Sequence, residues 1–455
     1  MDDKKFRIEK DSLGEVRVSK ARLWGAQTQR SLENFPIGQP HERMPMEIIY
    51  ALAQLKKACA KVNGQLKPEV ITEEKQEAIV AACDAILAKE LDAEFPLVVF
   101  QTGSGTQTNM NVNEVIAHYG KKLHPNDDVN ASQSSNDTFP SAMHIAFVLA
   151  IEEQLKPSLQ RLIDSFRKKE RQFQKIVKTG RTHLMDAVPI RFSQELSGYR
   201  FSLEQNLKML CRNMGCLREL AIGATAVGTG LNAPPGFDVE VCRVLREQTG
   251  VAFVPSPNKF HALTSLDEIV AVHGIIKAIA MDMFKIANDI RLAASGPRCG
   301  LNELILPANE PGSSIMPGKV NPTQCEAVTM VAVQVMGNDA AIGMAASQGN
   351  FELNVFMPVI AYDYLQSACL LADAIRSFDH NCAAGIRANR DRMSDNLHHS
   401  LMLVTCLNPY IGYENAARVA HKAFDESTSL RTAAVALGYL TEAEFDKVFR
   451  PEEMV

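Results

Sequence analysis

Three polar segments carry most of the side chains that could do chemistry. The first two are expected to break the helical pattern, over residues 101–113 and 124–137, and both are rich in hydroxyl and amide groups. Such groups donate hydrogen bonds without net charge, and Gly103 and Gly105 would let backbone amides approach a ligand. The two segments therefore predict binding of a carboxylate, although an ordinary turn would also be rich in Asn and Ser.

The third segment, residues 310–326, combines flexible positions with reactive side chains. Gly312 directly precedes Ser313, Gly318 directly precedes Lys319, and Asn321 follows. A mobile loop that carries a hydroxyl, a cation and an amide is a candidate active-site lid. We expect catalysis here, with Ser313 as a potential nucleophile or base and Lys319 as the cation.

The composition narrows the class of protein. Of the 455 residues, 46% are hydrophobic and 22% charged, which is enough to bury large cores. A net charge of −5 without a basic run argues against nucleic acid as the main partner. The ten cysteines are scattered, and none has the spacing of a zinc site, so a reduced compartment and no bound metal are expected.

No membrane segment is expected. The first residues lack the apolar core of a secretion signal, and the apolar stretch 327–347 is interrupted by Gln334, Asn338 and Asp339. We expect a soluble, cytoplasmic protein; a processed organellar form would fit the same beginning.

Composition and hydrophobic spacing predict a mainly helical chain, with a small N-terminal hairpin near residues 6–18. Apolar residues recur every three or four positions over 269–290 and again over 148–166, which is typical of long helices in a bundle. Another helix is predicted over 192–221, and 327–344 reads as a helix packed on every side. Shorter, more charged helices follow residue 390. These shorter helices suggest a small terminal domain.

Several of these segments together resemble the fumarase/aspartase superfamily. The strongest resemblance is Gly312-Ser-Ser-Ile-Met-Pro-Gly-Lys-Val-Asn-Pro322. The motifs 103–106, 134–137, 180–184 and 295–300 also resemble that superfamily and occur in the same order. The resemblance therefore spans nearly the whole chain.

Within the superfamily, the details are similar to class II fumarases. His183 follows Thr182 where aspartases carry Gln, and Thr-Gln-Cys follows Pro322. Two alternatives stay open: an ammonia-lyase similar to aspartase, and a helical scaffold without activity. Retention of the polar residues of the motifs favours an enzyme.

The resemblance implies a fumarate hydratase, a carbon–oxygen lyase of the tricarboxylic acid cycle that acts on the dicarboxylates fumarate and (S)-malate without a cofactor. It also implies an all-α fold of three domains: residues 1–133, a central bundle of 134–388, and 389–455. Four chains are expected to form a homotetramer around a central helical core, and each active site would collect loops from three of them. A helix that is apolar all round agrees with such an assembly.

The resemblance also suggests roles for single residues. Ser313 is expected to act as the carbanion-forming base, His183 as an acid oriented by Glu326, and Lys319 as the cation that stabilises the intermediate. The expected substrate-binding residues are Ser104, Gly105, Thr106, Ser134, Ser135, Asn136, Thr182, Ser314, Lys319, Val320 and Asn321. Which of Ser313 and His183 moves which proton stays open, and Glu326 could simply stabilise the start of a helix.

A second carboxylate site is implied around His124, Pro125, Asn126 and Asp127. Related sequences have an Arg just before this His, so Lys121 or Lys122 would have to replace it here. His124 and Asp127 could instead only cap a helix.

Overall fold

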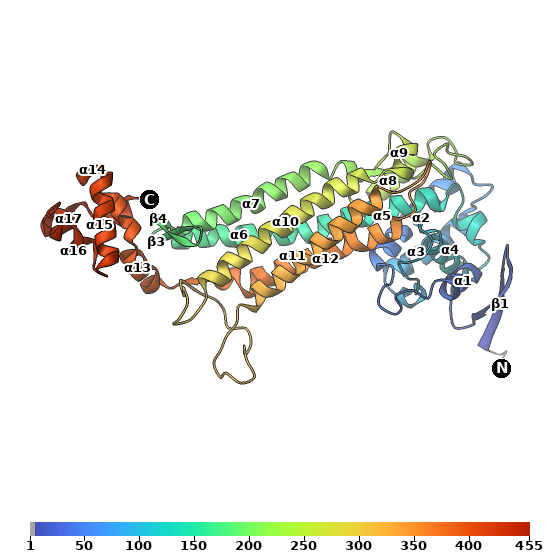
Figure 1. Ribbon diagram of the computed structural model, residues 1–455. Coiled ribbons are helices and arrows are strands. Elements are labelled where there is room, and N and C mark those ends of the chain that lie inside the picture. The colour runs from blue at the N-terminus through green and yellow to red at the C-terminus, as the bar shows by residue number, and fades with distance from the viewer. Residues whose placement is uncertain (1–4) are drawn as a thin grey trace. The chain divides into compact units, whose positions relative to one another are not determined.

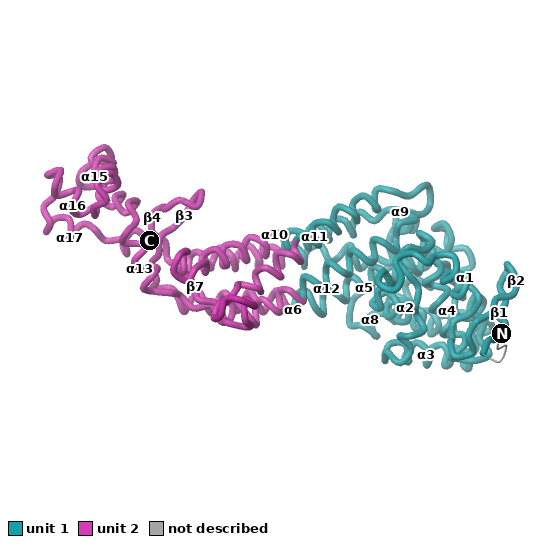
Figure 2. The backbone as a smooth tube through the Cα atoms, turned by 60° about the horizontal axis from the view of Figure 1, so that its bottom comes forward, with its two compact units in different colours: residues 1–157, 208–280, 333–372 teal, residues 158–207, 281–332, 373–455 magenta. Residues whose placement is uncertain are grey.

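The computed structural model describes residues 5–455, and α-helices dominate it (Figure 1). In the described part of the chain, the strands form only two-stranded sheets. The all-α prediction is confirmed. The chain divides into two compact units, each built from three separate stretches (Figure 2). Unit 1 contains residues 1–157, 208–280 and 333–372, and unit 2 contains 158–207, 281–332 and 373–455.

The helices are α1 Ala26–Asn34, α2 Met46–Leu66, α3 Glu73–Leu87, α4 Thr106–Gly120, α5 Ser135–Ala150, α6 Lys156–Phe173, α7 Phe192–Asn213, α8 Phe237–Thr249, α9 Lys259–Thr264, α10 Asp267–Ala293, α11 Thr323–Ala346, α12 Met357–Asn381, α13 Arg390–His399, α14 Asn408–Ile411, α15 Tyr413–Asp425, α16 Leu430–Ala436 and α17 Glu442–Val448. The strands are β1 Phe6–Asp11, β2 Gly14–Ser19, β3 Val177–Thr182, β4 Met185–Arg191, β5 Glu219–Leu220, β6 Val254–Pro255, β7 Leu304–Ile305 and β8 Arg387–Ala388.

The N-terminal hairpin is confirmed, with β1 antiparallel to β2 and Phe6 opposite Ser19. Next to it, the buried carboxylate of Glu114 on α4 accepts hydrogen bonds from the backbone N–H groups of Gly25, Gln27 and Thr28, at 2.8–3.1 Å. These donors belong to the first turn of α1, where N–H groups lack partners within the helix. Glu114 thereby joins the start of α1 to α4.

The first polar segment is partly helical. We expected a break over residues 101–113, but α4 begins at Thr106 and buries Asn109, Asn111 and Asn113. Asparagine normally disfavours a helix interior, and here tertiary hydrogen bonds outweigh that preference. The sequence pattern could not show these partners, so the prediction of a loop was wrong beyond Gly105.

The predicted seam over residues 269–290 is confirmed on α10, where Ile269, Val272, Ile276 and the later members are all buried. The seam over residues 148–166 is buried as well, but it is not one regular helix. A π-helical turn, Ile151–Leu155, separates α5 from α6. The predicted helix over 192–221 ends early, because α7 stops at Asn213 and a 3-10 turn and β5 follow.

Side-chain contacts join the long helices within each unit. In unit 1, the rings of Phe147 on α5 and Tyr364 on α12 stack with centroids 3.9 Å apart. In unit 2, Asn206 on α7 donates to Asp282 on α10 at 2.6 Å, and Arg167 on α6 pairs with Glu204 on α7 at 2.8 Å. Antiparallel helices with short connections pack in this manner in bundles.

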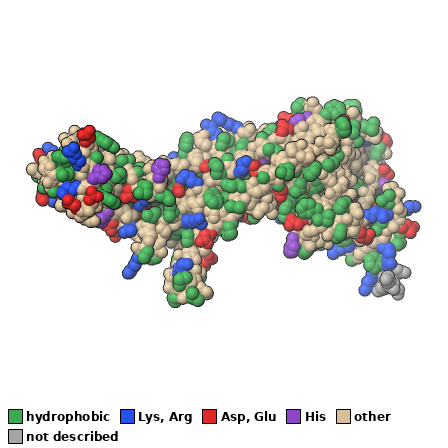
Figure 3. All heavy atoms as spheres, in the orientation of Figure 1, with side chains coloured by type: hydrophobic (Ala, Val, Ile, Leu, Met, Phe, Trp, Pro, Cys, Tyr) green, Lys and Arg blue, Asp and Glu red, His purple; other side chains and the backbone are tan. Residues whose placement is uncertain are grey.

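Helix α11 is less buried than its composition suggested. Met330, Val333 and Met344 are 60–73% exposed in the single chain, and Figure 3 shows hydrophobic side chains in green along the surface of the long helices. By length and composition α11 could also cross a membrane. However, Asn338 donates to Ser367 on α12, and Asp339 pairs with His273 on α10, so its polar face packs against protein.

The chain ends in short helices, as predicted after residue 390. Helices α15, α16 and α17 surround a small apolar core that includes Leu403, Leu407, Val419 and Phe445.

Candidate active site

The loop between α10 and α11 holds the hydroxyl of Ser313 against two backbone amides. Ser313 Oγ accepts hydrogen bonds from the N–H of Ile315 at 3.2 Å and from the N–H of Met316 at 3.0 Å. N–H groups aimed at an oxygen stabilise negative charge on it. Their dipoles are already oriented and, unlike water molecules, need not reorganise when the charge develops. The geometry suits a serine that carries negative charge as a base.

Backbone contacts close this loop, and they require glycine. The N–H of Gly312 donates to the carbonyl of Lys319 at 2.8 Å, and Asn321 Nδ2 donates to the carbonyl of Gly312 at 2.7 Å. A Cβ on Gly312 would lie 2.5 Å from the Lys319 carbonyl oxygen. Gly318 has φ +80°, a conformation that other residues rarely adopt. The loop therefore carries Ser313, Lys319 and Asn321 as one closed turn.

His183 lies at the tip of a β-hairpin that we did not predict from the sequence. Strands β3 and β4 pair antiparallel, and His183 and Leu184 form the two-residue turn with φ of 57° and 63°. Such turns have both central residues in the left-handed region, which matches the twist of the strands. Neither residue is glycine, and strained conformations of this kind occur at functional sites. The side chains of Thr182 and His183 are exposed in the single chain.

A buried ion pair anchors this hairpin. Arg181, next to Thr182, donates from Nη1 and Nη2 to the two carboxylate oxygens of Glu303, at 3.0 and 2.7 Å. Glu303 is fully buried and also contacts Lys178 Nζ at 3.1 Å and Asn396 Nδ2 at 3.0 Å. Burial alone would raise the pKa of Glu303, but the hydrogen bond from Arg181 and the charge of Lys178 outweigh it and lower the pKa.

Arg181→Met should lower the free energy of unfolding by about 3 kcal/mol at pH 7, because it removes a partner of a buried carboxylate. The pKa of Glu303 is lower when folded than its ordinary 4.5. The stabilisation is therefore present above that value and is lost as the pH falls through the folded pKa. Urea unfolding at several pH values would measure this, with Arg191→Met on the same hairpin as the control. Equal stability of both variants at pH 7 would contradict the prediction.

In unit 1, two helix starts bring substrate-binding candidates together. Thr106 begins α4 directly after Gly105, which has φ 71°, and Ser134 caps α5. Thr106, Ser134 and Ser135 line one cavity of about 500 Å³. Ser104 Oγ lies 2.8 Å from Thr106 Oγ1. N–H groups at helix starts favour anions, so this cavity suits a carboxylate.

Asp137 fixes the second of these loops. Its carboxylate accepts from the N–H of Ser134 at 2.9 Å, and from the N–H groups of Gly223 and Thr225 at 3.0 and 2.8 Å. Burial raises the pKa of Asp137 to about 6, although these hydrogen bonds oppose the shift. Asn136 Nδ2 donates to the carbonyl of Ala226 at 2.8 Å. The loop is therefore tied to residues 223–226.

Three of the four residues predicted for the second site lie at another cavity of unit 1, of about 840 Å³, and the fourth, Asp127, does not line it. His124, Pro125 and Asn126 line it together with Lys121 and Lys122, so the two lysines do lie near this His. The capping alternative also has support. His124 Nδ1 accepts from the N–H of Asp127 at 3.1 Å, at the start of a π-helical turn over Pro125–Val129.

Some of the predicted partners do not meet within the chain. Among residues 5–455, no hydrogen bond or ion pair joins His183 to Glu326, or Ser313 to the Lys319 side chain. Glu326 lies in the first turn of α11, where a negative charge is favourable by itself. His183, Lys319 and Glu326 are all exposed. Sequence reasoning also missed Glu303, because only the fold brings its carboxylate to Arg181.

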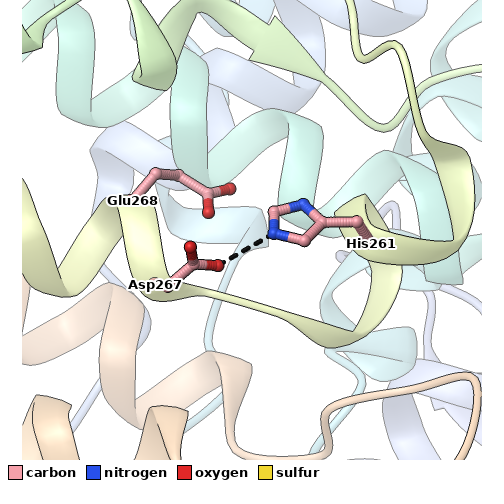
Figure 4. Close-up of side chains that lie close together, drawn as sticks. All are labelled: His261, Asp267 and Glu268. Atoms are coloured by element: carbon pink, nitrogen blue, oxygen red, sulfur yellow. Dashed lines mark hydrogen bonds and ion pairs between the residues drawn. The ribbon is translucent and has the colours of Figure 1, made fainter.

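One further group of potential ligands lies in unit 1, between α9 and α10 (Figure 4). Polar atoms of His261, Asp267 and Glu268 lie within 4.8 Å of one another. His261 Nε2 is 2.9 Å from Asp267 Oδ1, and Glu268 Oε1 is 3.4 Å from His144 Nε2. Carboxylates are favourable in the first turn of a helix such as α10. These ion pairs and the helix start account for the group.

Two family models match the chain. A lyase family matches residues 14–337, and a family described as the fumarase C C-terminus matches residues 403–455. The class II fumarate hydratases of Oceanobacillus iheyensis and Helicobacter pylori are each 58% identical, over 99% of both chains.

Solved structures show the same fold. A class II fumarase from Schistosoma mansoni matches with a TM-score of 0.96 and 42% identity, over 99% of both chains. A fumarate lyase:delta crystallin structure from Brucella melitensis, described as bound to cobalt, matches with a TM-score of 0.92 and 38% identity, also over 99% of both.

The fold and the matched loops define a lyase of the fumarase/aspartase superfamily. Within it, the high identity over the full length is decisive, and the chain belongs to the class II fumarate hydratases.

Proposed function

We propose that this protein catalyses the reversible, stereospecific hydration of fumarate to (S)-malate, as in the tricarboxylic acid cycle. The identity to class II fumarate hydratases over 99% of both chains supports this activity. Within the molecule, the observation that carries the proposal is the position of Ser313 Oγ between two backbone N–H groups, in the same closed loop as Lys319.

The reaction explains why such a loop is needed. Removing a proton from the carbon beside a carboxylate gives a dianion that water stabilises poorly. A preorganised cation and hydrogen-bond donors lower its energy, because they are already in place when the charge develops. We assign the cation to Lys319 and the orienting amide to Asn321. No metal or organic cofactor takes part in this proposal.

The proton transfers follow from the same assignment. In the direction of dehydration, the Ser313 alkoxide takes the proton from carbon, and His183 gives a proton to the leaving hydroxide, which departs as water. Hydration reverses both transfers. Glu326 would orient His183. The two carboxylates are held by a set of groups that includes Lys319 and Asn321; the others are Ser104, Gly105, Thr106, Ser134, Ser135, Asn136, Thr182, Ser314 and Val320. His124, Pro125, Asn126 and Asp127 form the proposed second carboxylate site.

We further propose a cytoplasmic homotetramer in which each active site uses loops from three chains. The exposure of His183, Lys319 and Glu326 in one chain supports this, since such chemistry is favoured where water is excluded. The apolar face of α11, with Met330 and Val333, supplies a surface for a second copy.

Light scattering tests the assembly. We expect a particle of about four times the chain mass of 50.1 kDa, active at the concentration measured. Met330→Glu should reduce its size and its activity together, because a charge on this face would be desolvated in the assembly. A fully active monomer would contradict the proposal.

The ultraviolet absorbance of fumarate tests the activity. In buffer with a chelator and without ammonium, we expect fumarate to be consumed and malate to appear. Turnover only with ammonium would indicate an aspartase-like lyase instead. A folded protein without turnover in either buffer would support the scaffold alternative.

A further inference from the structure

We propose that Lys56 is a positioning residue of the substrate site, whose buried ammonium group orients the hydroxyl of Ser135 toward a bound carboxylate. The inference rests on the proposed function. Lys56 lies on α2 and is 0% exposed, which is unusual for a lysine. Its Nζ donates to Asn130 Oδ1 at 2.8 Å and to Gln133 Oε1 at 2.9 Å.

The hydrogen bonds continue from Asn130 to the serine. Asn109 Nδ2, on α4, lies 3.2 Å from Asn130 Oδ1 and 2.9 Å from Ser135 Oγ. Asn109 Oδ1 in turn accepts from Thr138 Oγ1 at 3.1 Å. A chain of contacts therefore runs from Lys56 through Asn130 and Asn109 to Ser135, all within unit 1.

The ammonium group favours one direction for every bond in this chain, and the Gln133 backbone carbonyl, which accepts from Asn130 Nδ2 at 3.2 Å, favours the same direction. An ammonium can only donate, so the Asn130 atom beside Lys56 must be its carbonyl oxygen. That oxygen only accepts hydrogen bonds, so the Asn109 atom that faces it must belong to the NH₂ group; Asn113 Nδ2 also donates to the same oxygen, at 3.2 Å. The second hydrogen of this group is then donated to Ser135 Oγ. The hydroxyl proton of Ser135 is left to point away from the protein interior.

This direction matters for the substrate. Ser135 lines the cavity of about 500 Å³ that also contains Thr106 and Ser134. A carboxylate only accepts hydrogen bonds, so it needs the Ser135 proton rather than a lone pair. If the chain ran the other way, the serine would donate inward and its oxygen would repel the substrate. Because the buried ammonium group of Lys56 can only donate, it disfavours the arrangement in which Ser135 donates inward.

The electrostatic setting is consistent with a charged Lys56. Burial lowers the pKa of Lys56 to about 8, while nearby Cys59 and Asp137 act in the opposite direction. The ammonium form is therefore the main one at neutral pH. Its charge also adds a positive potential behind the loop that binds the dianion.

Three variants test the proposal by steady-state kinetics with fumarate. Lys56→Met should raise KM at least tenfold and change kcat less than threefold, because the chemistry itself uses other residues. Asn109→Asp should also raise KM at least tenfold, since a carboxylate would accept the Ser135 proton. Lys57→Met, the neighbouring lysine that pairs with Asp84, is the matched control and should leave both constants within twofold.

A double-mutant cycle separates positioning from general structural damage. If Lys56 acts through Ser135, Lys56→Met added to Ser135→Ala should raise KM less than twofold further. Multiplicative effects on KM, or a normal KM in Lys56→Met, would overturn the proposal. If thermal melting shows that Lys56→Met does not fold, the KM of Asn109→Asp becomes the test. A normal KM in that variant would overturn the proposal.

The wild-type protein separates this proposal from the proposed function. If the wild-type protein turns over fumarate and the Lys56→Met and Asn109→Asp variants have a normal KM, only the role of Lys56 is rejected. No wild-type turnover would reject the proposed function. In that case, calorimetric binding of succinate to the same variants would still test Lys56: weaker binding in Lys56→Met supports it, and unchanged binding overturns it.

Discussion

Ser313→Ala is expected to lower kcat for fumarate hydration by about 10³-fold or more while changing the KM less than fivefold. The reason is the placement of Ser313 Oγ, which two backbone N–H groups prepare to carry negative charge. Alanine removes the oxygen that exchanges a proton with carbon, but it leaves the loop closure between Gly312 and Lys319 intact. Steady-state kinetics and light scattering would measure both constants and the assembly.

The control for this variant is Ser394→Ala, an exposed serine of α13 that should behave as wild type. Deuterium exchange at the malate carbon gives a second reading, because only the base breaks that C–H bond. If Ser313→Ala kept near-normal turnover and exchange, Ser313 would not be the base, and the proton would be assigned to another group.

His183→Asn should lower kcat/KM by about 10²-fold to 10³-fold, since the leaving hydroxide loses its acid. Asparagine is the right replacement because it tolerates the φ of 57° at this turn better than most residues. The hairpin and the oligomer should therefore persist. The pH dependence of kcat/KM should also lose one limb, which distinguishes lost proton transfer from lost binding.

His421→Asn, at an exposed position of α15, is the matched control and should behave as wild type. A normal rate and an unchanged pH profile in His183→Asn would remove His183 from the mechanism. Glu326→Gln tests the proposed partner of His183. If Glu326 orients His183 in the assembled protein, kcat/KM should fall in the same limb of the pH profile, but by less than in His183→Asn. If Glu326 only stabilises the start of α11, kcat/KM should not change.

The sequence by itself predicted the features that depend on local spacing and residue type. The apolar seam of α10 follows from a period of three and four residues, and every member from Ile269 to Ile290 is buried. The N-terminal hairpin follows from short alternation around Gly14. The segments that carry Ser313, His183 and Ser134 were recognisable as motifs, because their reactive residues are close together in the sequence.

Other features depend on partners that are distant in the sequence. The helical state of Asn109 and Asn113 depends on Asn130, and the anchoring of Arg181 depends on Glu303. The sequence alone gave little indication of a role for Lys56, which is simply a lysine within an apolar face of α2. Its meaning came from Asn130 and Gln133, about 75 residues later along the chain.

The physical reason is the range of the interactions. Periodicity, turn chemistry and residue type act over a few neighbours, so the sequence determined the helical class, the reactive groups and their order. Buried polar groups need partners wherever the fold supplies them, and those partners decide amide orientation, the direction of hydrogen bonds and pKa. The tertiary structure therefore decided how Ser135, His183 and Ser313 are held, whereas the sequence had already determined which residues they are.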